Sequence, residues 1–443
     1  MSSEWAVQRL DQIAEINPTR KVHKGSAVPF VDMAALPQFS RDISVNDVVV
    51  REAKGAGAHF QNGDTLLARI TPCLENGKTA QVRCLDGDAI AEGSTEFIVL
   101  CGKDPADNDY IYYLCREPAF REYAIGRMEG TSGRQRVSWQ SIAAYQFAFP
   151  SPEERRETAR VLSTLDDRIT LLRETNATLE AIAQALFKSW FVDFDPVRAK
   201  MEGRTPEGMD EATAALFPDG LETSELGEVP RGWRVGTVAS VALLNAKSLS
   251  PRNPPPEINY LDLAGVKANV FDVPQCYSFA DAPSRARRVL QEGDCIVGTV
   301  RPGNRSFGFI ATAQNHLIGS TGFAVLSPKQ HWMTAFTYLC ATRDESIDRL
   351  ASLADGGAYP AVRPDVVAST PCTLPPDEVM KVFDGAARPL LDAIGANSEQ
   401  AQTLSTLRDT LLPRLISGQL RLPEAQALSQ EAMKPKTISA SAL

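Results

Sequence analysis

The chain has 443 residues, enough for two or three domains of about 100–200 residues each. Hydrophobic residues make up 43% and charged residues 23% of the sequence, a composition that excludes wholesale disorder. The net charge of −9 excludes a protein that is basic all over its surface, but it leaves room for a local basic face. No apolar run approaches the roughly 18 residues of a membrane span, and the start lacks a secretory pattern, so we expect a cytoplasmic protein.

Residues 1–150 predict an α+β domain. Short β-branched and aromatic runs alternate there with Gly, Asp and Asn turns, and residues 48–50 and 97–100 are predicted strands. Residues 110–127 predict a helix.

Residues 151–193 predict one long helix with a coiled-coil seam. From Leu162 to Trp190, core positions recur at alternating spacings of three and four residues. Asn176 is the single polar residue in this seam, and a buried Asn at such a position typically fixes the register of a coiled coil. The acidic, proline-punctuated stretch 194–227 that follows predicts a connector with one short helix over 210–216.

The chain then repeats itself. The recurrences keep their order at offsets of 225 to 230 residues, so they indicate two copies of one unit. Examples are Gly63-Asp64 with Gly293-Asp294, Gly93-Ser94-Thr95-x-Phe97 with Gly319-Ser320-Thr321-x-Phe323, and Tyr113-Leu114-Cys115 with Tyr338-Leu339-Cys340. Residues 228–375 therefore predict a second α+β domain, with a strand over 323–326 and a helix over 332–353.

Residues 376–423 predict a second long helix with a weaker seam. Asn397 and Arg408 interrupt this seam, and Pro389 is expected to kink or break the first turns of the helix. Each long helix could pack on its own domain. We favour pairing of the two helices, because they share one spacing and neither could bury its seam alone. The tail 424–443 is rich in Ala, Ser, Gln and Lys and is predicted to be disordered.

The sequence lacks a convincing catalytic motif. Asn253-Pro254-Pro255-Pro256 has no aromatic fourth residue, which the similar motif of amino-methyltransferases needs for stacking on a flipped base. Asp42, Glu52 and Lys54 follow the order found in metal-dependent nucleases, but the second copy has no equivalent. The eight cysteines form no CxxC pair and the four histidines are isolated, so we expect reduced cysteines and no metal site.

Two sets of polar loops are suited to nucleic acid. Arg can bridge two acceptors of guanine, Asn or Gln can read adenine, and Glu can accept from cytosine, while small residues let backbone N–H groups approach phosphates. The first copy offers Arg69, Thr71, Glu75, Asn76, Lys78, Thr131, Ser132, Arg134, Gln135 and Arg136. The second copy offers Arg285, Arg287, Arg288, Arg301, Asn304, Arg305, Tyr359 and Arg363.

At these residues the chain resembles the specificity (S) subunit of type I restriction–modification systems. The resemblance runs from Trp5 to about Pro423. Its most specific pieces are the run from Gly63 to Lys78, which contains Thr-Pro-Cys-Leu-Glu-Asn-Gly-Lys, and the segments 93–97, 191–200, 206–209 and 411–418. The second copy lacks the Thr-Pro-Cys-Leu-Glu-Asn-Gly-Lys string, so its DNA contacts are less securely placed.

The resemblance implies two target-recognition domains, separated by an antiparallel coiled coil, that each read one half of a bipartite, asymmetric site on double-stranded DNA. It also implies two methyltransferase (M) subunits as partners, which two restriction (R) subunits can join. S-adenosylmethionine, ATP and magnesium would then belong to the partners, with no cofactor and no catalysis in this chain. The apolar end of the first long helix is expected to be exposed and is a candidate partner surface, with ordinary packing as the equal alternative: Phe187, Trp190, Phe191 and Phe194.

Two other functions compete with this one. The first is a metal-dependent nuclease that uses Asp42, Glu52 and Lys54. The second is a scaffold without sequence preference.

Overall fold

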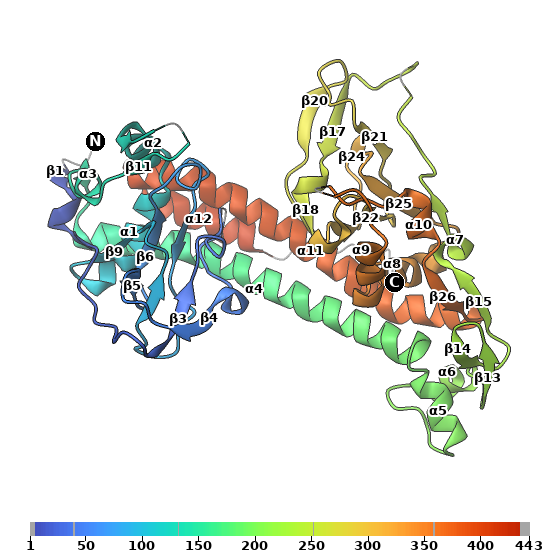
Figure 1. Cartoon of the computed structure of the whole chain (residues 1–443). Coiled ribbons are helices and arrows are strands. Elements are labelled where there is room, and N and C mark those ends of the chain that lie inside the picture. The colour runs from blue at the N-terminus through green and yellow to red at the C-terminus, as the bar shows by residue number, and fades with distance from the viewer. Residues whose placement is uncertain (1–4, 39, 132, 251, 358, 435–443) are drawn as a thin grey trace. The chain divides into compact units, whose positions relative to one another are not determined.

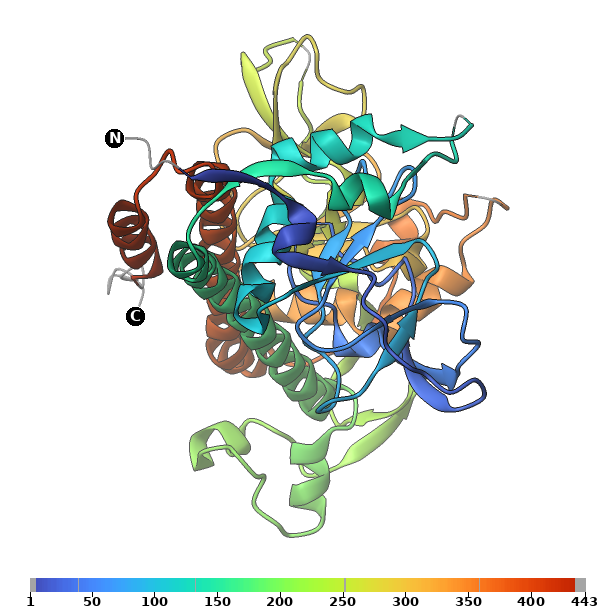
Figure 2. The same cartoon turned by 90° about the vertical axis from the view of Figure 1, so that its left-hand side faces the viewer.

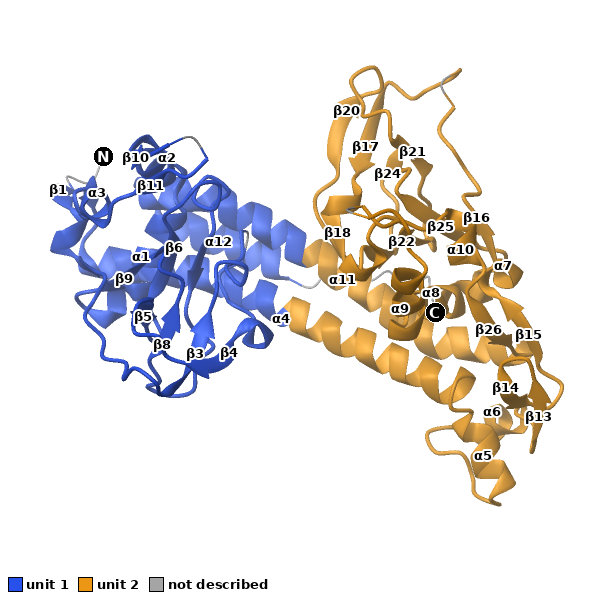
Figure 3. Cartoon of the chain, viewed as in Figure 1, with its two compact units in different colours: residues 1–171, 401–443 blue, residues 172–400 orange. Residues whose placement is uncertain are grey.

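The computed structural model describes residues 5–434, apart from residues 39, 132, 251 and 358. The chain forms two compact units, one made of residues 1–171 with 401–443 and the other of residues 172–400 (Figure 3). Two 40-residue helices, α4 (Pro152–Phe191) and α11 (Asp377–Ile416), contribute one part to each unit. None of the helices among the described residues combines the length and apolar composition that a membrane crossing needs.

Unit 1 contains two four-stranded sheets that share one core. The first sheet has the antiparallel order β2-β9-β6-β7, and the second has the order β4-β3-β8-β5 with β3 and β8 parallel. Leu66, Phe97, Phe60 and Val31 belong to the core cluster that both sheets bury. The elements of this unit are β1 (Ala6–Arg9), β2 (Ala14–Ile16), β3 (Ala27–Val31), β4 (Val49–Glu52), β5 (Ala58–Phe60), β6 (Thr65–Ala68), β7 (Thr79–Gln81), β8 (Ala91–Gly93), β9 (Phe97–Gly102), α1 (Asn108–Arg116), α2 (Pro118–Gly126), β10 (Met128–Glu129), β11 (Arg136–Val137), α3 (Trp139–Ala143), β12 (Gln146–Phe149) and α12 (Leu422–Met433).

Unit 2 repeats this sheet topology strand for strand. Its sheets have the orders β16-β25-β22-β23 and β20-β17-β24-β21, with β17 and β24 parallel, and β15 pairs with β26 as β1 pairs with β12 (Figure 1). The predicted duplication is therefore confirmed in the structure. The elements are α5 (Asp195–Met201), α6 (Glu211–Ala215), β13 (Leu221–Ser224), β14 (Gly227–Pro230), β15 (Arg234–Thr237), α7 (Val238–Val241), β16 (Ala242–Leu244), β17 (Glu257–Leu261), β18 (Val266–Lys267), β19 (Val270–Phe271), β20 (Gln275–Ser278), β21 (Ala286–Val289), β22 (Cys295–Gly298), β23 (Phe307–Phe309), β24 (Leu317–Ser320), β25 (Phe323–Pro328), α8 (Thr334–Thr342), α9 (Asp344–Ser352), α10 (Pro364–Ala368) and β26 (Pro371–Leu374).

The sequence predicted one helix over residues 110–127 and one over residues 332–353, but each of these segments forms two helices. In unit 1 the chain leaves the helical conformation at Glu117, with ψ of 132°, because Pro118 disfavours a helical residue before it. In unit 2 the break falls at Arg343, with ψ of 154°, at the equivalent place between α8 and α9.

The two long helices contact each other within each unit. In unit 1 the Nη1 of Arg408 on α11 lies 2.5 Å from Oδ1 of Asp166 on α4, and the two helices lie side by side in Figure 2. In unit 2 the Nδ2 of Asn397 donates to the Oδ1 of Asn176 at 2.9 Å. Further along this unit Phe191 packs on Phe383, so the residue numbers rise on α4 as they fall on α11 and the helices run antiparallel there. The preferred pairing of the helices is confirmed.

The prediction for Pro389 was wrong in part, because α11 is not broken there and runs as one helix from residue 377 to residue 416. Pro389 cannot donate a hydrogen bond to the carbonyl of Gly385, four residues earlier. Both residues are exposed, so water can satisfy that carbonyl and the helix tolerates the proline.

The prediction for the tail was also wrong over its first part, because α12 continues to Met433 and buries Ala425. Residues 435–443 lie outside the described residues. The expected short helix of the connector is α6, and the connector also contains α5 and the β13–β14 hairpin, which the sequence analysis did not anticipate.

Candidate nucleic-acid interface

Two of the loops singled out in the first copy meet at one end of the β2-β9-β6-β7 sheet. The N–H of Thr71 donates to the carbonyl of Gln135 at 3.0 Å, and the N–H of Val137 donates to the carbonyl of Arg69 at 3.0 Å. The N–H of Arg69 in turn donates to the carbonyl of Glu96 at 3.0 Å, just before β9. We call this set of three segments, joined by three backbone hydrogen bonds, the crossing of unit 1. Residues about 65 positions apart in the sequence thus form one surface.

Arg136 and Glu96 form an ion pair on this surface. The Nε and Nη2 of Arg136 lie 2.9 Å and 2.7 Å from the two carboxylate oxygens of Glu96, and the Arg136 side chain remains 42% exposed. Hydrogen bonding to the Glu96 carboxylate raises the pKa of Arg136 above its ordinary value. The guanidinium is therefore held in place while it faces solvent.

The other candidates of the first copy differ in how available they are. Glu75, Asn76, Thr131 and Arg134 are exposed, whereas Arg69, Thr71 and Gln135 are half-buried. Lys78 already has a partner, because its Nζ donates to the backbone carbonyl of Met33 at 2.7 Å. This bond connects the loop to the segment that follows β3. Ser132 lies outside the described residues.

Unit 2 builds the same crossing from different side chains. The N–H of Arg301 donates to the carbonyl of Pro360 at 2.7 Å, the N–H of Val362 to the carbonyl of Thr299 at 2.9 Å, and the N–H of Thr299 to the carbonyl of Gly322 at 2.8 Å. These three bonds match the three of unit 1 one for one. They align Arg301 with Thr71, Thr299 with Arg69, Gly322 with Glu96 and Ala361 with Arg136.

The exposed cation of the second crossing is Arg301, which lies over an aromatic ring. Its guanidinium carbon lies 4.7 Å from the ring centroid of Tyr359, whose side chain is 71% exposed. Asn304 and Arg363 are also exposed, and Arg363 lies 3.3 Å from Asp365. Arg305 forms an ion pair with Asp344 in the first turn of α9.

In the arginine cluster next to β21, Arg285 lies beside the crossing of unit 2. Arg287 and Arg288 are partly buried. The carbonyl of Arg285 accepts from the N–H of Thr321 at 2.8 Å, beside Gly322, and its exposed side chain lies 3.8 Å from Asp262. Arg287 lies over Phe279, 6.0 Å from the ring centroid, and is half-buried. Arg288 is half-buried as well, and its burial lowers the pKa of the guanidinium.

Comparisons with known proteins relate the chain to one family. Residues 2–181 match the family described as the type I restriction modification DNA specificity domain. The specificity subunit of the type I restriction enzyme MjaIX from Methanocaldococcus jannaschii is 26% identical over 448 residues, covering 95% of this chain and 94% of that protein. The specificity subunit of the type I restriction enzyme HindI from Haemophilus influenzae is 26% identical over 82% of this chain and 87% of its own length. Residues 2–181 thus match the specificity-domain family, and nearly the whole chain is similar to type I restriction–modification specificity subunits.

A solved structure supports the fold of this chain. The S subunit of a type I restriction–modification system from M. genitalium superposes with a TM-score of 0.50, covering 93% of this chain and 96% of that one. At 13% sequence identity this likeness concerns the fold alone.

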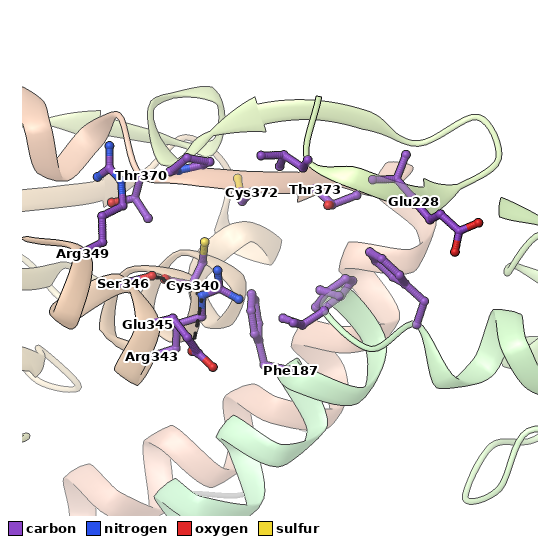
Figure 4. A pocket seen from close by; sticks show the side chains of 16 residues that line it. Phe187, Glu228, Cys340, Arg343, Glu345, Ser346, Arg349, Thr370, Cys372 and Thr373 are labelled. Atoms are coloured by element: carbon purple, nitrogen blue, oxygen red, sulfur yellow. Dashed lines mark hydrogen bonds and ion pairs between the residues drawn. The ribbon is translucent and has the colours of Figure 1, made fainter. Parts of the chain in front are cut away.

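The prediction of an exposed aromatic surface at the end of the first long helix was wrong. Phe187, Trp190, Phe191 and Phe194 are between 2% and 6% exposed, because they pack with Phe217, Trp233, Phe336 and Phe383 in the core of unit 2. The alternative of ordinary packing at the helix end is the correct one. Phe187, Phe191 and Phe194 also line a pocket of about 350 Å³ together with Cys340, Cys372 and Arg343 (Figure 4).

The residues of the alternative nuclease do not form a metal site. The carboxylate of Asp42 is engaged by the guanidinium of Arg41 at 3.0 Å and the hydroxyl of Thr170 at 2.8 Å, while Glu52 and Lys54 are exposed at the end of β4. Within the described part of the chain, no three His, Cys, Asp or Glu side chains are grouped as metal ligands would be. The described residues therefore give no support to this alternative.

Glu96 belongs to the same surface as Arg136, although no motif in the sequence predicted it. Glu96 occupies the variable position of the repeated Gly-Ser-Thr-x-Phe motif, where the second copy has Gly322. That difference between the copies was the available signal, but only the structure shows that Arg136 lies beside it.

Proposed function

We propose that this chain is the non-catalytic DNA-binding specificity subunit of a type I restriction–modification complex, acting in the cytoplasm. Each repeat would read one half of a bipartite, asymmetric site on double-stranded DNA. The observation that carries the proposal is the shared crossing of three hydrogen-bonded segments, which presents different side chains in the two units. One backbone frame with two sets of polar groups suits a protein that reads two different half-sites.

The paired helices α4 and α11 would form the antiparallel coiled coil that sets the gap between the half-sites. A helix of 40 residues extends about 60 Å, between one and two turns of duplex DNA at about 34–36 Å per turn. The complex would contain two methyltransferase subunits, which two restriction subunits can join. S-adenosylmethionine, ATP and magnesium would be bound by those partners rather than by this chain.

The test is genome-wide adenine methylation by single-molecule sequencing, with this gene intact and deleted. We expect one split motif to lose its methylation on deletion and to regain it when the gene is supplied on a plasmid. An unchanged methylome in cells that express both this gene and its methyltransferase gene would contradict the proposal.

The gap can be tested separately from the half-sites. Removing seven residues from α4 and seven from the facing part of α11 preserves the heptad register and shortens the pair by about 10 Å. We expect the gap in the methylated motif to change while each half keeps its sequence. An unchanged gap in an active variant would contradict the role of the helices as a spacer.

A further inference from the structure

The ion pair between Arg136 and Glu96 leaves the Arg136 side chain 42% exposed. Glu96 accepts from Nε and from Nη2, and the carbonyl of Arg134 accepts from Nη1 at 3.3 Å. These contacts use three of the five N–H groups of an arginine. One N–H group on each terminal nitrogen remains for a further partner, and arginine makes bidentate hydrogen bonds through two such N–H groups.

Glu96 and Arg136 are not needed to hold the crossing together. Unit 2 makes the same three backbone hydrogen bonds with Gly322 and Ala361 in their places, so the frame forms without an ion pair. An ion pair that is 42% exposed on the arginine side and 24% on the glutamate side also contributes little to stability. The pair therefore needs an explanation other than folding.

The charge of the pair favours a base over a phosphate as the target of Arg136. Contacts to phosphate depend on net positive charge, and Glu96 offsets that of Arg136. A bidentate contact depends instead on a guanidinium whose plane is fixed, which the two bonds to Glu96 provide. The O6 and N7 atoms of guanine in the major groove are the acceptors that such a fork matches.

We propose that Arg136 reads one guanine in the half-site of unit 1 and that Glu96 is the positioning residue that orients its guanidinium, an inference that rests on the proposed function. Unit 2 has no equivalent of this pair, so the guanine contact belongs to one half of the site only. Arg136 makes the contact, and Glu96 acts through Arg136.

The experiment uses the assembled complex, purified from the host, and measures methylation rates on duplexes that carry the site with each of the four bases at every guanine. The variants are Arg136→Ala, Arg136→Lys, Glu96→Gln and the double variant Glu96→Gln/Arg136→Ala. Arg160→Lys and Glu157→Gln serve as matched controls, because this exposed pair has the same chemistry but lies on α4.

We expect Arg136→Ala and Arg136→Lys each to reduce the preference for guanine at one position of one half-site by about 10- to 100-fold, since lysine keeps the charge but not the fork. Glu96→Gln should reduce the same preference by less, and the double variant should equal Arg136→Ala. The other half-site and both controls should keep the wild-type preferences.

Three results would overturn the inference. The first is restoration of full activity by Arg136→Lys when Arg136→Ala lowers it on all sequences alike, because that pattern indicates a phosphate contact. The second is an unchanged preference in Arg136→Ala, and the third is loss of preference at a base other than guanine. Failure of the proposed function is distinguishable, because deletion of the wild-type gene would then leave the methylome unchanged before any variant is made.

Discussion

Asp166 and Arg408, which are 242 positions apart in the sequence, form a buried ion pair in unit 1. Both side chains are 3% exposed, and the hydroxyl of Tyr113 on α1 donates to the second oxygen of Asp166 at 2.7 Å. Burial disfavours the charge of Arg408, but Asp166 and Asp409 outweigh this effect and raise the pKa of Arg408. Arg408, one of the two residues that interrupt the seam of the second long helix, therefore has a specific partner on the first.

Substitution of Arg408 should destabilise unit 1 more than substitution of both partners. Arg408→Leu leaves the Asp166 carboxylate buried without its cation, which typically costs about 3–5 kcal/mol of unfolding free energy. Asp166→Leu/Arg408→Leu removes both charges and leaves only the Tyr113 hydroxyl without an acceptor, at about 1–3 kcal/mol. Urea unfolding measures both, and Arg160→Leu, which breaks an exposed pair with Glu157, should cost under about 1 kcal/mol. A double variant less stable than Arg408→Leu would contradict this assignment.

The amide pair of unit 2 should behave as a determinant of register. Asn176 donates to the carbonyl of Ile394 at 3.1 Å and to the hydroxyl of Ser398 at 3.0 Å, and it accepts from Asn397. Asn176→Leu removes these bonds and should cost about 1 kcal/mol, because the site is only half-buried. Asn176→Leu/Asn397→Leu should recover stability but allow alternative registers, as apolar seams do. Urea midpoints and disulfide trapping between cysteines placed on the two helices would detect both effects, and a double variant as costly as the two single changes together would contradict the prediction.

The sequence predicted the repeat and the long helices well, because both depend on local periodicity. The spacing of core positions from Leu162 to Trp190 and the recurrence of short motifs identify elements without knowledge of their partners. The sequence could not predict that Arg408 would pair with Asp166. A charged residue in an apolar seam does not indicate which distant residue it contacts. The same reason explains why Glu96 was missed.

Exposure was the hardest property to predict. Phe191 ends the first long helix and Phe194 follows it, and both looked like part of a partner surface. Phe217 from the connector and Trp233 from the second repeat pack in the same buried cluster and cover them. The covering residues come from elements whose position depends on tertiary packing, and the connector was expected to have little structure. The apolar residues at the helix end therefore did not show, from the sequence alone, whether they would be exposed to solvent or buried.

The buried carboxylate of Asp294 should make stability depend on pH. Asp294 is 2% exposed and accepts from the N–H of Gln291 at 2.8 Å, and burial raises the pKa of its carboxyl above the ordinary value of 3.8. A folded-state pKa above the unfolded value gives stability that is fully present below pH 3.8 and is lost as pH rises through the folded pKa. Asp294→Asn keeps an acceptor for Gln291 without a charge, so it should be more stable than wild type near pH 7. This advantage should shrink as pH falls towards 4.

Urea unfolding of both proteins between pH 4 and pH 8 tests this expectation for Asp294. Asp348→Asn, at an exposed position on α9, is the control and should show no such trend. An advantage of Asp294→Asn that grew on acidification would have the wrong sign and would contradict the assignment.

The contact of Arg301 with Tyr359 should determine recognition by unit 2 alone. The guanidinium of Arg301 lies over the exposed ring of Tyr359, and this contact helps to orient it. Arg301→Ala should therefore weaken binding and relax one half of the methylated motif, with a loss of about 1–3 kcal/mol if a base contact disappears. Tyr359→Phe keeps the aromatic face and should change little, whereas Tyr359→Ala should resemble a milder form of Arg301→Ala.

Arg231→Ala, which removes an exposed arginine beside Asp219, is the control and should leave the motif unchanged. Methylome sequencing of strains carrying each allele measures all four, and relaxation of the half-site that responds to Arg136→Ala would show that the two crossings do not read separate halves.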